Sequence, residues 1–322
     1  MRDCILAVDI GGTKVLAGIL SRDGRILVSR KEPVCAIGCP EEVLKQIFRM
    51  FQQMMNTIGI NSQNILGTGV GVPGPLDYVR GVVENSPNLR WLSYPIRDEL
   101  SKRLGTKLLL DKDTNVAALG EKKYGMSRNC SHFIYITIST GIGGGIVADG
   151  KILHGQIGGA SELGHMLVAP GGRRCACGRV GCLEAHASGT ALSLDAKELI
   201  ARGKGQNILT FCARGQAPTA YELGLAARQG DAEAIALINR AADYAAIGVA
   251  NLVNIFNPER IVIGGGVGIG LQDFMLPRIR EYVFANVFPL HKRNLAIEAT
   301  QLGEDIVLLG CASMVLHDQL EE

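Results

Sequence analysis

The residues best suited to metal chemistry lie in one glycine-rich segment, residues 162–184, which reads ELGHMLVAPGGRRCACGRVGCLE. His165 precedes Cys175, Cys177 and Cys182, and thiolates with imidazole are the ligands that zinc prefers in closed tetrahedral sites. Because the segment has little apolar core, a bound metal would supply its folding free energy, on the order of 10 kcal/mol in small zinc sites. Three reduced thiols in a loop are the alternative. We expect a structural Zn²⁺ site.

Two acids lie at the end of a second informative stretch, residues 108–111 (LLLD), which we predict to be a buried strand. Asp111 and Asp113 lie at its end, and a helix is expected from there through Tyr124. In α/β folds, polar groups at strand ends beside a helix N-terminus commonly form active sites. One of these carboxylates could take a proton from a hydroxyl near a transferring phosphoryl group. The alternative is that Asp113 or Thr114 caps the helix.

The sequence DIGGTK at residues 9–14 indicates an anion site between two strands. Strands are predicted over residues 4–10, 15–20 and 26–29, with a hairpin turn at residues 23–24. Gly11 and Gly12 let backbone N–H groups approach an anion, and Thr13 adds a hydroxyl donor. Asp9 could orient a hydrated Mg²⁺. A plain hairpin is the alternative.

The same unit of strand, glycine-rich turn and strand recurs near residue 142. A strand over residues 133–138 is followed by a turn containing Thr140, Gly141 and Gly143, and then by a strand through residue 147. Such repetition indicates two related halves. A third strand, over residues 260–263, closes in a glycine-rich turn whose Gly265 and Gly266 would leave room for an adenine ring.

The remaining chain is expected to supply framework elements. Helices are predicted over residues 40–58, 231–256 and 305–317, the last packing back on the N-terminal domain. The alanine-rich helix 231–256 could be a dimer surface or core. A strand over residues 66–72 ends at a Pro-Gly-Pro turn, and residues 83–91 read as a polar loop. In that loop Asn85 and Asn88 could bind a polyol or cap turns.

Composition bounds the function classes. The chain has 322 residues, 47% hydrophobic and 20% charged, which is typical of a globular protein of two domains. A net charge of +2 gives no reason to invoke nucleic acid or a membrane surface. With no export signal or long apolar run, the nine cysteines are expected to be reduced thiols or metal ligands in the cytoplasm.

These motifs in combination resemble the ROK family of sugar kinases, in its bacterial glucokinase branch, from about residue 5 to residue 317. The matching stretches are DIGGTK, GVPGPLD, LDKDTNVAALGE, TISTGIGGGIV, ELGHM, CxCGxxGCxE and NPERIVIGGGV. The resemblance implies an α/β, two-domain actin/hexokinase-like (ribonuclease H-like) ATPase fold, each domain a mixed sheet flanked by helices with a cleft between. The expected domains are residues 1–116 plus 305–322 and residues 117–304, the latter with the zinc loop 165–182.

The resemblance also implies an enzyme that transfers phosphate from ATP, with Mg²⁺, to the 6-hydroxyl of a hexose. Asp113 would be the catalytic base. Sugar hydroxyls would be bound by Asn88, Lys112, Asp113, Glu162, His165 and Glu184, and zinc by His165, Cys175, Cys177 and Cys182. Nucleotide contacts are expected from Asp9, Gly11, Gly12, Thr13, Lys14, Thr140, Gly141, Gly143, Gly265 and Gly266. The expected assembly is a homodimer or homotetramer.

One residue departs from the family pattern. Glucokinases of this family usually carry Asn before the catalytic Asp, where this chain has Lys112. Lys donates hydrogen bonds but cannot accept them, and its charge would favour ionised Asp113 while weakening it as a base. The resemblance implies glucose as the substrate. The departure at Lys112 keeps allose, N-acetylmannosamine, N-acetylglucosamine and fructose as alternatives.

Two other classes are weighed against a sugar kinase. A sugar-responsive repressor of the same family would carry a helix-turn-helix ahead of the first glycine turn, whereas here Asp9 follows only eight residues. A metal-dependent nuclease could use Asp9, Asp111 and Asp113 as a two-metal cluster, but it needs no adenosine pocket. We therefore expect a kinase.

Overall fold

The computed structural model describes residues 3–213 and 215–321 and divides the chain into two compact units. Unit 1 comprises Met1–Asn129, Ile152–Ala160 and Glu304–Glu322, and unit 2 comprises Cys130–Lys151 and Ser161–Gly303. The expected boundary at residue 116 falls inside a helix that belongs wholly to unit 1. Ile152–Ala160, expected in the second domain, also belongs to unit 1.

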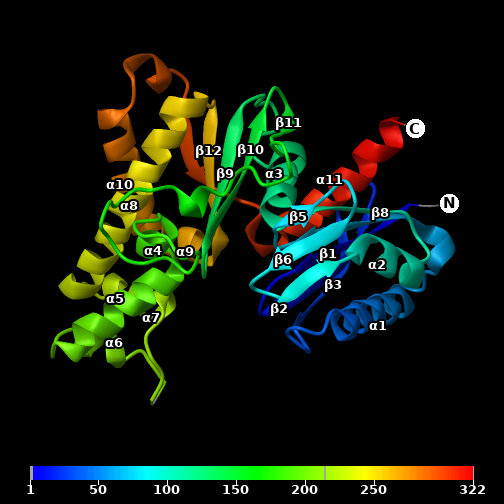
Figure 1. The fold of residues 1–322 in the computed structure, drawn as a ribbon, viewed down its shortest axis with the longest axis horizontal. Helices are drawn as coiled ribbons and strands as arrows, with labels where there is room; N and C mark the ends of the chain where they lie inside the picture. Colours follow the sequence, from blue (N-terminus) through cyan, green and yellow to red (C-terminus); the bar gives the residue numbers. More distant parts are fainter. Residues whose placement is uncertain (1–2, 214, 322) are drawn as a thin grey trace. The chain divides into compact units, whose positions relative to one another are not determined.

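Unit 1 is built on a five-stranded sheet in the order β3-β2-β1-β4-β8 (Figure 1). The first three strands form an antiparallel meander, while β4 and β8 run parallel to β1. The strands are β1 Cys4–Ile10, β2 Lys14–Ser21, β3 Ile26–Pro33, β4 Ile65–Val72 and β8 Leu108–Lys112. The sequence placed these strands to within a few residues, and its largest error was to end β3 too early.

The helices of unit 1 are α1 Pro40–Ile58, α2 Ile96–Leu104, α3 Asp113–Tyr124 and α11 Ile306–Glu321. Helix α1 has the predicted bounds: Pro40 occupies its first turn, and Gly59 ends it in the left-handed conformation. Its apolar stripe is buried against β2 and β3. Helix α11 packs on α3, β4 and β1, which confirms that the last helix joins the N-terminal unit.

Close backbone packing fixes α3, which carries the candidate base. A Cβ placed on Gly69 of β4 would lie 2.6 Å from Cys311 Cβ on α11, so that helix rests directly on the strand. A Cβ placed on Gly310 of α11 would lie 1.8 Å from the carbonyl oxygen of Val116 on α3. Because contacts between carbon atoms are most favourable near 3.5–4.0 Å, larger side chains would push these elements apart. The start of α3 is thereby held against the end of β4.

A small three-stranded sheet corrects one prediction for unit 1. Residues 83–91 were expected to be a polar loop, but they lie in and between the antiparallel strands β6 Val82–Ser86 and β7 Trp91–Tyr94. The third strand is β5 Leu76–Asp77, and a 3₁₀ turn, η1 Ser62–Asn64, precedes β4. Trp91 is buried in the core, which the polar composition of this stretch does not reveal.

Unit 2 repeats the strand order of unit 1, as β11-β10-β9-β12-β13. An antiparallel hairpin of β9 and β10 is again followed by strands parallel to β9. This confirms the predicted repeat. The strands are β9 Phe133–Ile138, β10 Ile142–Ala148, β11 Lys151–Ile152, β12 Arg260–Gly264 and β13 Ala296–Ala299. Two glycine-rich stretches differ from prediction: Gly143 lies within β10, and Gly265–Gly270 forms helix α9 instead of a turn.

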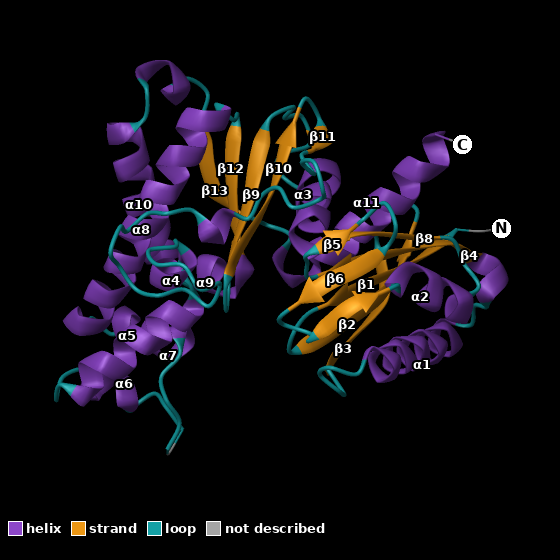
Figure 2. Ribbon diagram, in the orientation of Figure 1, coloured by secondary structure: helices purple, strands orange, loops and turns teal. Residues whose placement is uncertain are grey.

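Helices cover the sheet of unit 2, and α8 and α10 lie side by side (Figure 2). The bounds are α4 Glu184–Ala187, α5 Gly189–Ala201, α6 Gln206–Leu209, α7 Ala220–Arg228, α8 Ala232–Phe256 and α10 Gln272–Asn286, with 3₁₀ turns η2 Leu163–His165, η3 Pro289–Lys292 and η4 Gly303–Asp305. Helix α8 was predicted to be either a dimer surface or part of the core. Its alanine face is buried in the core. Within the described residues, every helix is too short or too polar to cross a membrane.

Candidate functional site

The polar residues of unit 1 gather at the ends of its parallel strands. In the register of the sheet, Asp9 of β1 pairs with Gly71 of β4, and Gly71 pairs with Asp111 of β8. Asp113 follows two residues later as the first residue of α3. Gly71 between the acids is closely packed, because a Cβ placed there would lie 2.6 Å from Val307 Cγ1 of α11. The two carboxylates expected to do chemistry, Asp9 and Asp113, therefore belong to one strand edge.

Asp111 and Asp113 have different environments although they are two residues apart. Asp111 is buried, and both of its oxygens are engaged. Oδ1 accepts from Lys112 N at 2.6 Å and from Asn115 Nδ2 at 3.0 Å, while Oδ2 lies 2.6 Å from His154 Nε2. These contacts leave Asp111 little capacity to bind a substrate or metal. They also argue against a two-metal cluster that includes it.

Asp113 is only partly buried, and its Oδ1 accepts the backbone N–H of Thr114 at 2.8 Å. Helix α3 has Lys112 as its N-cap residue, with no side-chain cap hydrogen bond, so Asp113 sits inside the first turn. The positive end of the helix dipole favours an ionised carboxylate at this position. Of the two acids, Asp113 is the more exposed.

Burial and two neighbouring charged side chains set the pKa of Asp9. Burial, and after it the Asp113 carboxylate, raise the pKa of Asp9 to about 7, while Lys14 opposes the shift. The interaction between the two carboxylates shows that they share one electrostatic environment. A divalent cation bound at Asp9 would offset the unfavourable charge of this pair.

The β1–β2 turn is tight and open on one side. Gly11 N donates to the carbonyl oxygen of Lys14 at 2.9 Å. Across the described chain, no backbone carbonyl accepts the N–H groups of Gly12 or Thr13, which suits the capture of an anion. A Cβ on Gly12 would lie 3.1 Å from Asn88 Cβ, so the structure brings predicted nucleotide and sugar residues together here. Lys14 Nζ lies 3.4 Å from Glu304 Oε2.

Lys112 is buried, and its ammonium group donates to the carbonyl oxygen of Ala160 at 3.0 Å. Ala160 ends the Ile152–Ala160 segment, which His154 also attaches to unit 1. The His154 ring stacks on Tyr78 with 4.0 Å between ring centroids, in addition to its contact with Asp111. Sequence reasoning missed His154, because a single His after a short apolar run carries no motif.

In unit 2, the turn between β9 and β10 is held by side chains from distant segments. Glu184 Oε2 accepts the backbone N–H of Ile142 at 2.9 Å, and Thr190 Oγ1 donates to the carbonyl oxygen of Thr140 at 2.8 Å. Gly141 must be small, because a Cβ there would lie 2.4 Å from Glu184 Oε2. The predicted phosphate turn and the predicted sugar ligand Glu184 are thus in direct contact.

The adenosine candidates lie at the start of α9. Gly265 adopts a φ of +81°, and a Cβ there would meet the carbonyl oxygen of Ile138 at 2.4 Å. Both observations require glycine at the point where α9 begins beside the end of β9. Gly266 has open space around it. This backbone surface is free of side-chain bulk, as the sequence predicted, although it is helical.

The His and Cys residues form one compact cluster. The ligand atoms of His165, Cys175, Cys177 and Cys182 all lie within 4.8 Å of one another. His165 Nδ1 is 3.8 Å from Cys175 Sγ, and Cys177 Sγ is 3.7 Å from Cys182 Sγ, too far for a disulfide. Tetrahedral zinc with Zn–S bonds of about 2.3 Å places its sulfur atoms about 3.8 Å apart. The cluster therefore fits zinc in both donor type and spacing.

The thiols of the cluster have different pKa values. Hydrogen bonds from the backbone and guanidinium of Arg179 lower the pKa of Cys177 to about 6. Burial raises the pKa of Cys175 and raises that of Cys182 to about 12. A metal must displace protons from the two buried thiols, so its affinity will rise with pH.

The remaining predicted sugar ligands border this cluster. Glu162 is exposed at the start of η2, whose last residue is His165. Cys175 Sγ lies 3.9 Å from Glu184 Oε1. Because Nδ1 of His165 faces the sulfur atoms, Nε2 lies on the opposite side of the ring. Unit 2 therefore brings the metal candidates, Glu184 and the Thr140–Gly141 turn into one neighbourhood.

Two units that repeat one strand order, each with a glycine turn after its first strand, define the actin/hexokinase-like ATPase fold. The ROK family model matches residues 5–318, and the chain belongs to the ROK family. It is 36% identical to a glucokinase of Thermotoga maritima over 97% of this chain and 96% of the relative. It is 31% identical to a putative xylose repressor of Caldicellulosiruptor, over 98% of this chain and 79% of the relative.

Among solved structures, a ROK family glucokinase from Streptomyces griseus in complex with glucose and AMPPNP is similar to this chain. The TM-score is 0.84 at 31% identity, over 97% of this chain and 98% of that one. Both the kinase and the repressor relatives share the region that carries the candidate sites.

Proposed function

We propose that this protein is an ATP-dependent hexokinase that phosphorylates the 6-hydroxyl of a hexose, with glucose as the expected substrate. The observation that carries the proposal is the placement of Asp113, partly exposed at the N-terminus of α3 and at the same strand edge as Asp9 and the glycine turn. The similarity to glucokinases, one of them in complex with glucose and AMPPNP, supports this assignment.

In the proposed reaction, Asp113 accepts the proton of the sugar hydroxyl as the phosphoryl group moves in line to its oxygen. The helix dipole at the first turn of α3 favours a negatively charged group there, and the close Gly310 contact holds the helix in place. Since phosphoryl transfer depends chiefly on positioning and charge, the rigid attachment of α3 matters as much as the base itself.

The nucleotide is assigned to the two glycine turns. In unit 1, the free N–H groups of Gly12 and Thr13 would bind phosphate oxygens, with Lys14 beside them. In unit 2, Thr140, Gly141 and Gly143 would serve the phosphates, and Gly265 and Gly266 would border adenosine. Mg²⁺, when bound, neutralises charge on the phosphates, and Asp9 is the residue that would orient it.

The sugar is assigned to Asn88, Glu162, His165 and Glu184, with Asp113 as the base. Glu184 supports this, because its position links the phosphate turn to the cysteine loop. Zinc bound by His165 and the three cysteines would fix the tautomer and orientation of the His165 ring. The metal would then be structural: it would hold sugar-binding groups in place and take no part in the transfer.

Lys112 bears on which hexose is preferred. Its ammonium is engaged by the Ala160 carbonyl, so we expect it to shape the pocket through its position, whereas the Asn usual in family glucokinases also offers an acceptor oxygen. This difference keeps allose, N-acetylmannosamine, N-acetylglucosamine and fructose as alternative substrates.

A coupled assay of ADP formation across glucose and these four sugars tests the proposal. We expect sugar-dependent ATP consumption with the highest kcat/KM for glucose, and a product phosphorylated at the 6-hydroxyl by NMR. If no sugar stimulates ATP consumption, the kinase assignment is wrong. A sugar-sensitive DNA-binding assay would then test the repressor function that one relative is named for.

We further propose that the protein is cytoplasmic, where ATP is available, and forms a homodimer or homotetramer. Light scattering coupled to size-exclusion chromatography measures the assembly directly. A monomeric mass at micromolar concentration would contradict it.

A further inference from the structure

A polar cavity lies in unit 2. It encloses about 310 Å³, and its walls come from the cysteine loop and helices α4, α5 and α8. Three arginines, two acids and one histidine line it: Arg173, Arg202, Arg240, Asp195, Glu198 and His186. The predicted kinase chemistry uses none of these residues.

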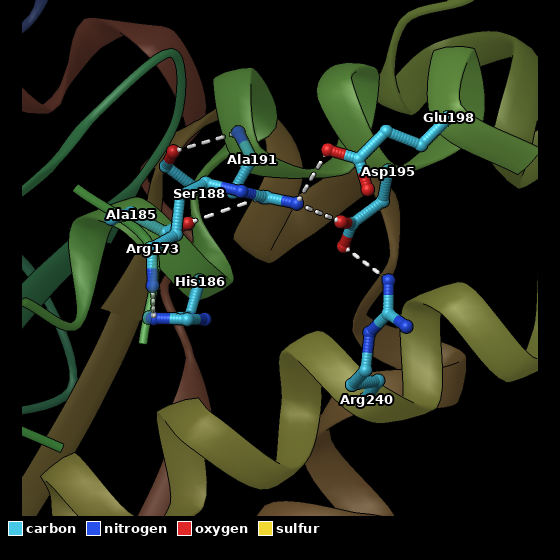
Figure 3. A network of polar contacts seen from close by, with 8 residues as sticks. All are labelled: Arg173, Ala185, His186, Ser188, Ala191, Asp195, Glu198 and Arg240. Atoms are coloured by element: carbon cyan, nitrogen blue, oxygen red, sulfur yellow. Dashed lines mark hydrogen bonds and ion pairs between the residues drawn. The ribbon is translucent and has the colours of Figure 1, made fainter. Parts of the chain in front are cut away.

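A buried acid organises the cavity. Asp195 is 6% exposed, and its two oxygens hold different guanidinium groups (Figure 3). Oδ1 accepts from Arg173 Nη2 at 2.5 Å, and Oδ2 forms an ion pair with Arg240 Nη2 at 2.7 Å. Arg173 also donates to the Ala185 carbonyl and to Glu198, but because a guanidinium has five N–H donors, both arginines keep N–H groups beyond these contacts. Asp195 thus holds two guanidinium groups on the cavity wall and leaves them N–H donors for a ligand.

The cavity carries more positive than negative charge. Glu198 lies 3.3 Å from Arg173 Nη2 and is the second acid of the wall. Arg202 is exposed, and within the described residues no carboxylate lies within ion-pair distance of it. Three guanidinium groups therefore face two carboxylates, and the excess cation is the one at the rim.

His186 adds a neutral donor. Burial, and the nearby cation Arg173, lower the pKa of His186, so the ring is neutral at neutral pH. Its Nε2 accepts the backbone N–H of Arg173 at 3.1 Å, which places the ring proton on Nδ1. Figure 3 shows this second nitrogen directed away from Arg173, and the ring packs on Tyr244 with centroids 4.5 Å apart. No residue in the described ranges accepts from Nδ1.

We propose that this cavity binds the phosphate group of a phosphate monoester, with a sugar phosphate as the best-fitting class. Guanidinium forks match the several oxygens of a phosphate, and a neutral His N–H adds a further donor. A volume of about 310 Å³ exceeds what one inorganic phosphate fills and lies at the lower end of small-molecule sites. The space next to Tyr244 and Leu237 would receive the organic part.

An occupant would be coupled to the cysteine loop through Arg173. This residue lies between the metal candidates His165 and Cys175, and its carbonyl accepts Gly181 N at 3.0 Å within the loop. A ligand that draws on the Arg173 guanidinium would therefore alter the restraint on that loop. Any effect on sugar phosphorylation rests on the proposed function, whereas binding at the cavity does not.

The test is calorimetric titration of the full chain with glucose 6-phosphate, inorganic phosphate and acetate. Saturating glucose and AMPPNP are included so that the candidate sugar and nucleotide sites are filled. Arg202→Gln should weaken glucose 6-phosphate binding about tenfold or more, because a charge-assisted contact is lost. Glu198→Gln should tighten binding severalfold, because a competing anion is removed. Lys204→Gln, which removes a neighbouring exposed charge outside the cavity, should change the Kd less than about twofold.

The outcomes separate the possible ligands. Glucose 6-phosphate binding more tightly than inorganic phosphate supports a sugar-phosphate site, whereas equal affinities assign the site to the free anion. Acetate binding as tightly as phosphate, equal losses in Arg202→Gln and Lys204→Gln, or no titration by the wild type at millimolar ligand would each overturn the proposal. Failure of glucose turnover with these responses intact would overturn the proposed function alone.

Discussion

The two units build the same sheet but hold their polar residues by different means. In unit 1, backbone packs on backbone: Gly69 lets α11 rest on β4, and Gly310 lets α11 approach α3. In unit 2, side chains and sulfur atoms cross-link loops, as Glu184 does for the β9–β10 turn and the cysteine cluster does for residues 165–182. One strand order therefore supports a closely packed site in unit 1 and a site in unit 2 that depends on side-chain contacts and on the cluster of His165 and three cysteines.

The largest expected effect comes from replacing Asp113, the proposed catalytic base in unit 1. Asp113→Asn should lower kcat about 10²–10⁴-fold, because the base is removed while the side-chain shape is kept. Sugar affinity and the unfolding midpoint should stay close to wild type. Steady-state kinetics with denaturant unfolding measure both, and turnover within a few-fold of wild type would contradict the assignment.

Asp111→Asn is the matched control for that variant. Asp111 contacts Asn115 and His154 with both oxygens, so its loss should lower the free energy of unfolding by about 1–3 kcal/mol. Replacing Asp111 should thus affect mainly stability, whereas replacing Asp113, two residues away, should affect mainly turnover.

The next largest effect tests the packing of unit 1. Gly310→Ala places a Cβ 1.8 Å from the Val116 carbonyl oxygen, so α3 and α11 must separate, at an expected cost of about 3 kcal/mol. Gly270→Ala, in α9 of unit 2, meets nothing within 4 Å and should stabilise by about 0.4–1 kcal/mol. Urea unfolding compares the two. Equal effects would mean that close packing does not distinguish the units.

Much of this contrast was readable in the sequence, because its signals are local. The bounds of α1 follow from Pro40 and the apolar period, and the His and Cys spacing gave the cluster. The repeat of strand, glycine turn and strand predicted the two hairpins, β1–β2 and β9–β10. These features need only neighbouring residues to be recognised.

The sequence did not reveal contacts between residues that lie far apart in the chain. His154 meets Asp111 across 43 positions, and no local pattern marks either as a partner. The strands around Trp91 were missed for a different reason: β6 and β7 pair locally, but the polar residues in and between them hide the strand pattern. Residues 264–267 were predicted to form a turn, but helix α9 begins at Gly265, where the positive φ and the nearby Ile138 carbonyl require glycine.

The cross-linked loop of unit 2 should respond to loss of a ligand. Cys175→Ser should lower bound zinc, measured by elemental analysis, and raise the sugar KM about tenfold or more, because His165 and Glu184 lose their support. Limited proteolysis should cut the 162–184 segment faster while α3 stays protected. Cys212→Ser, a cysteine of unit 2 outside the cluster, is the control. Wild-type zinc content and KM in Cys175→Ser would exclude the proposed cluster.

The smallest expected effect is the pH response of Asp9 in unit 1. Its pKa in the folded chain is about 7, above the ordinary value of 3.8, so the folded state binds this proton more tightly than the unfolded state. Stability from this group is therefore present below about pH 4 and is lost as pH rises toward 7. Because each pKa unit is worth 1.36 kcal/mol and Asp9 is only partly buried, we expect about 1–2 kcal/mol between pH 5 and 8.

Asp9→Asn isolates this component, because Asn does not ionise. Metal-free urea unfolding at pH 5, 6, 7 and 8 should show a fall in stability for the wild type that is shallower in the variant. Asp23→Asn is the control: the Ser21 hydrogen bond lowers the pKa of Asp23, so that group changes stability only in acid. Identical pH slopes for the wild type and Asp9→Asn would mean that Asp9 is ionised throughout. The Asp9 carboxylate, at the strand edge of unit 1, would then be as accessible to water as side chains in the loops of unit 2.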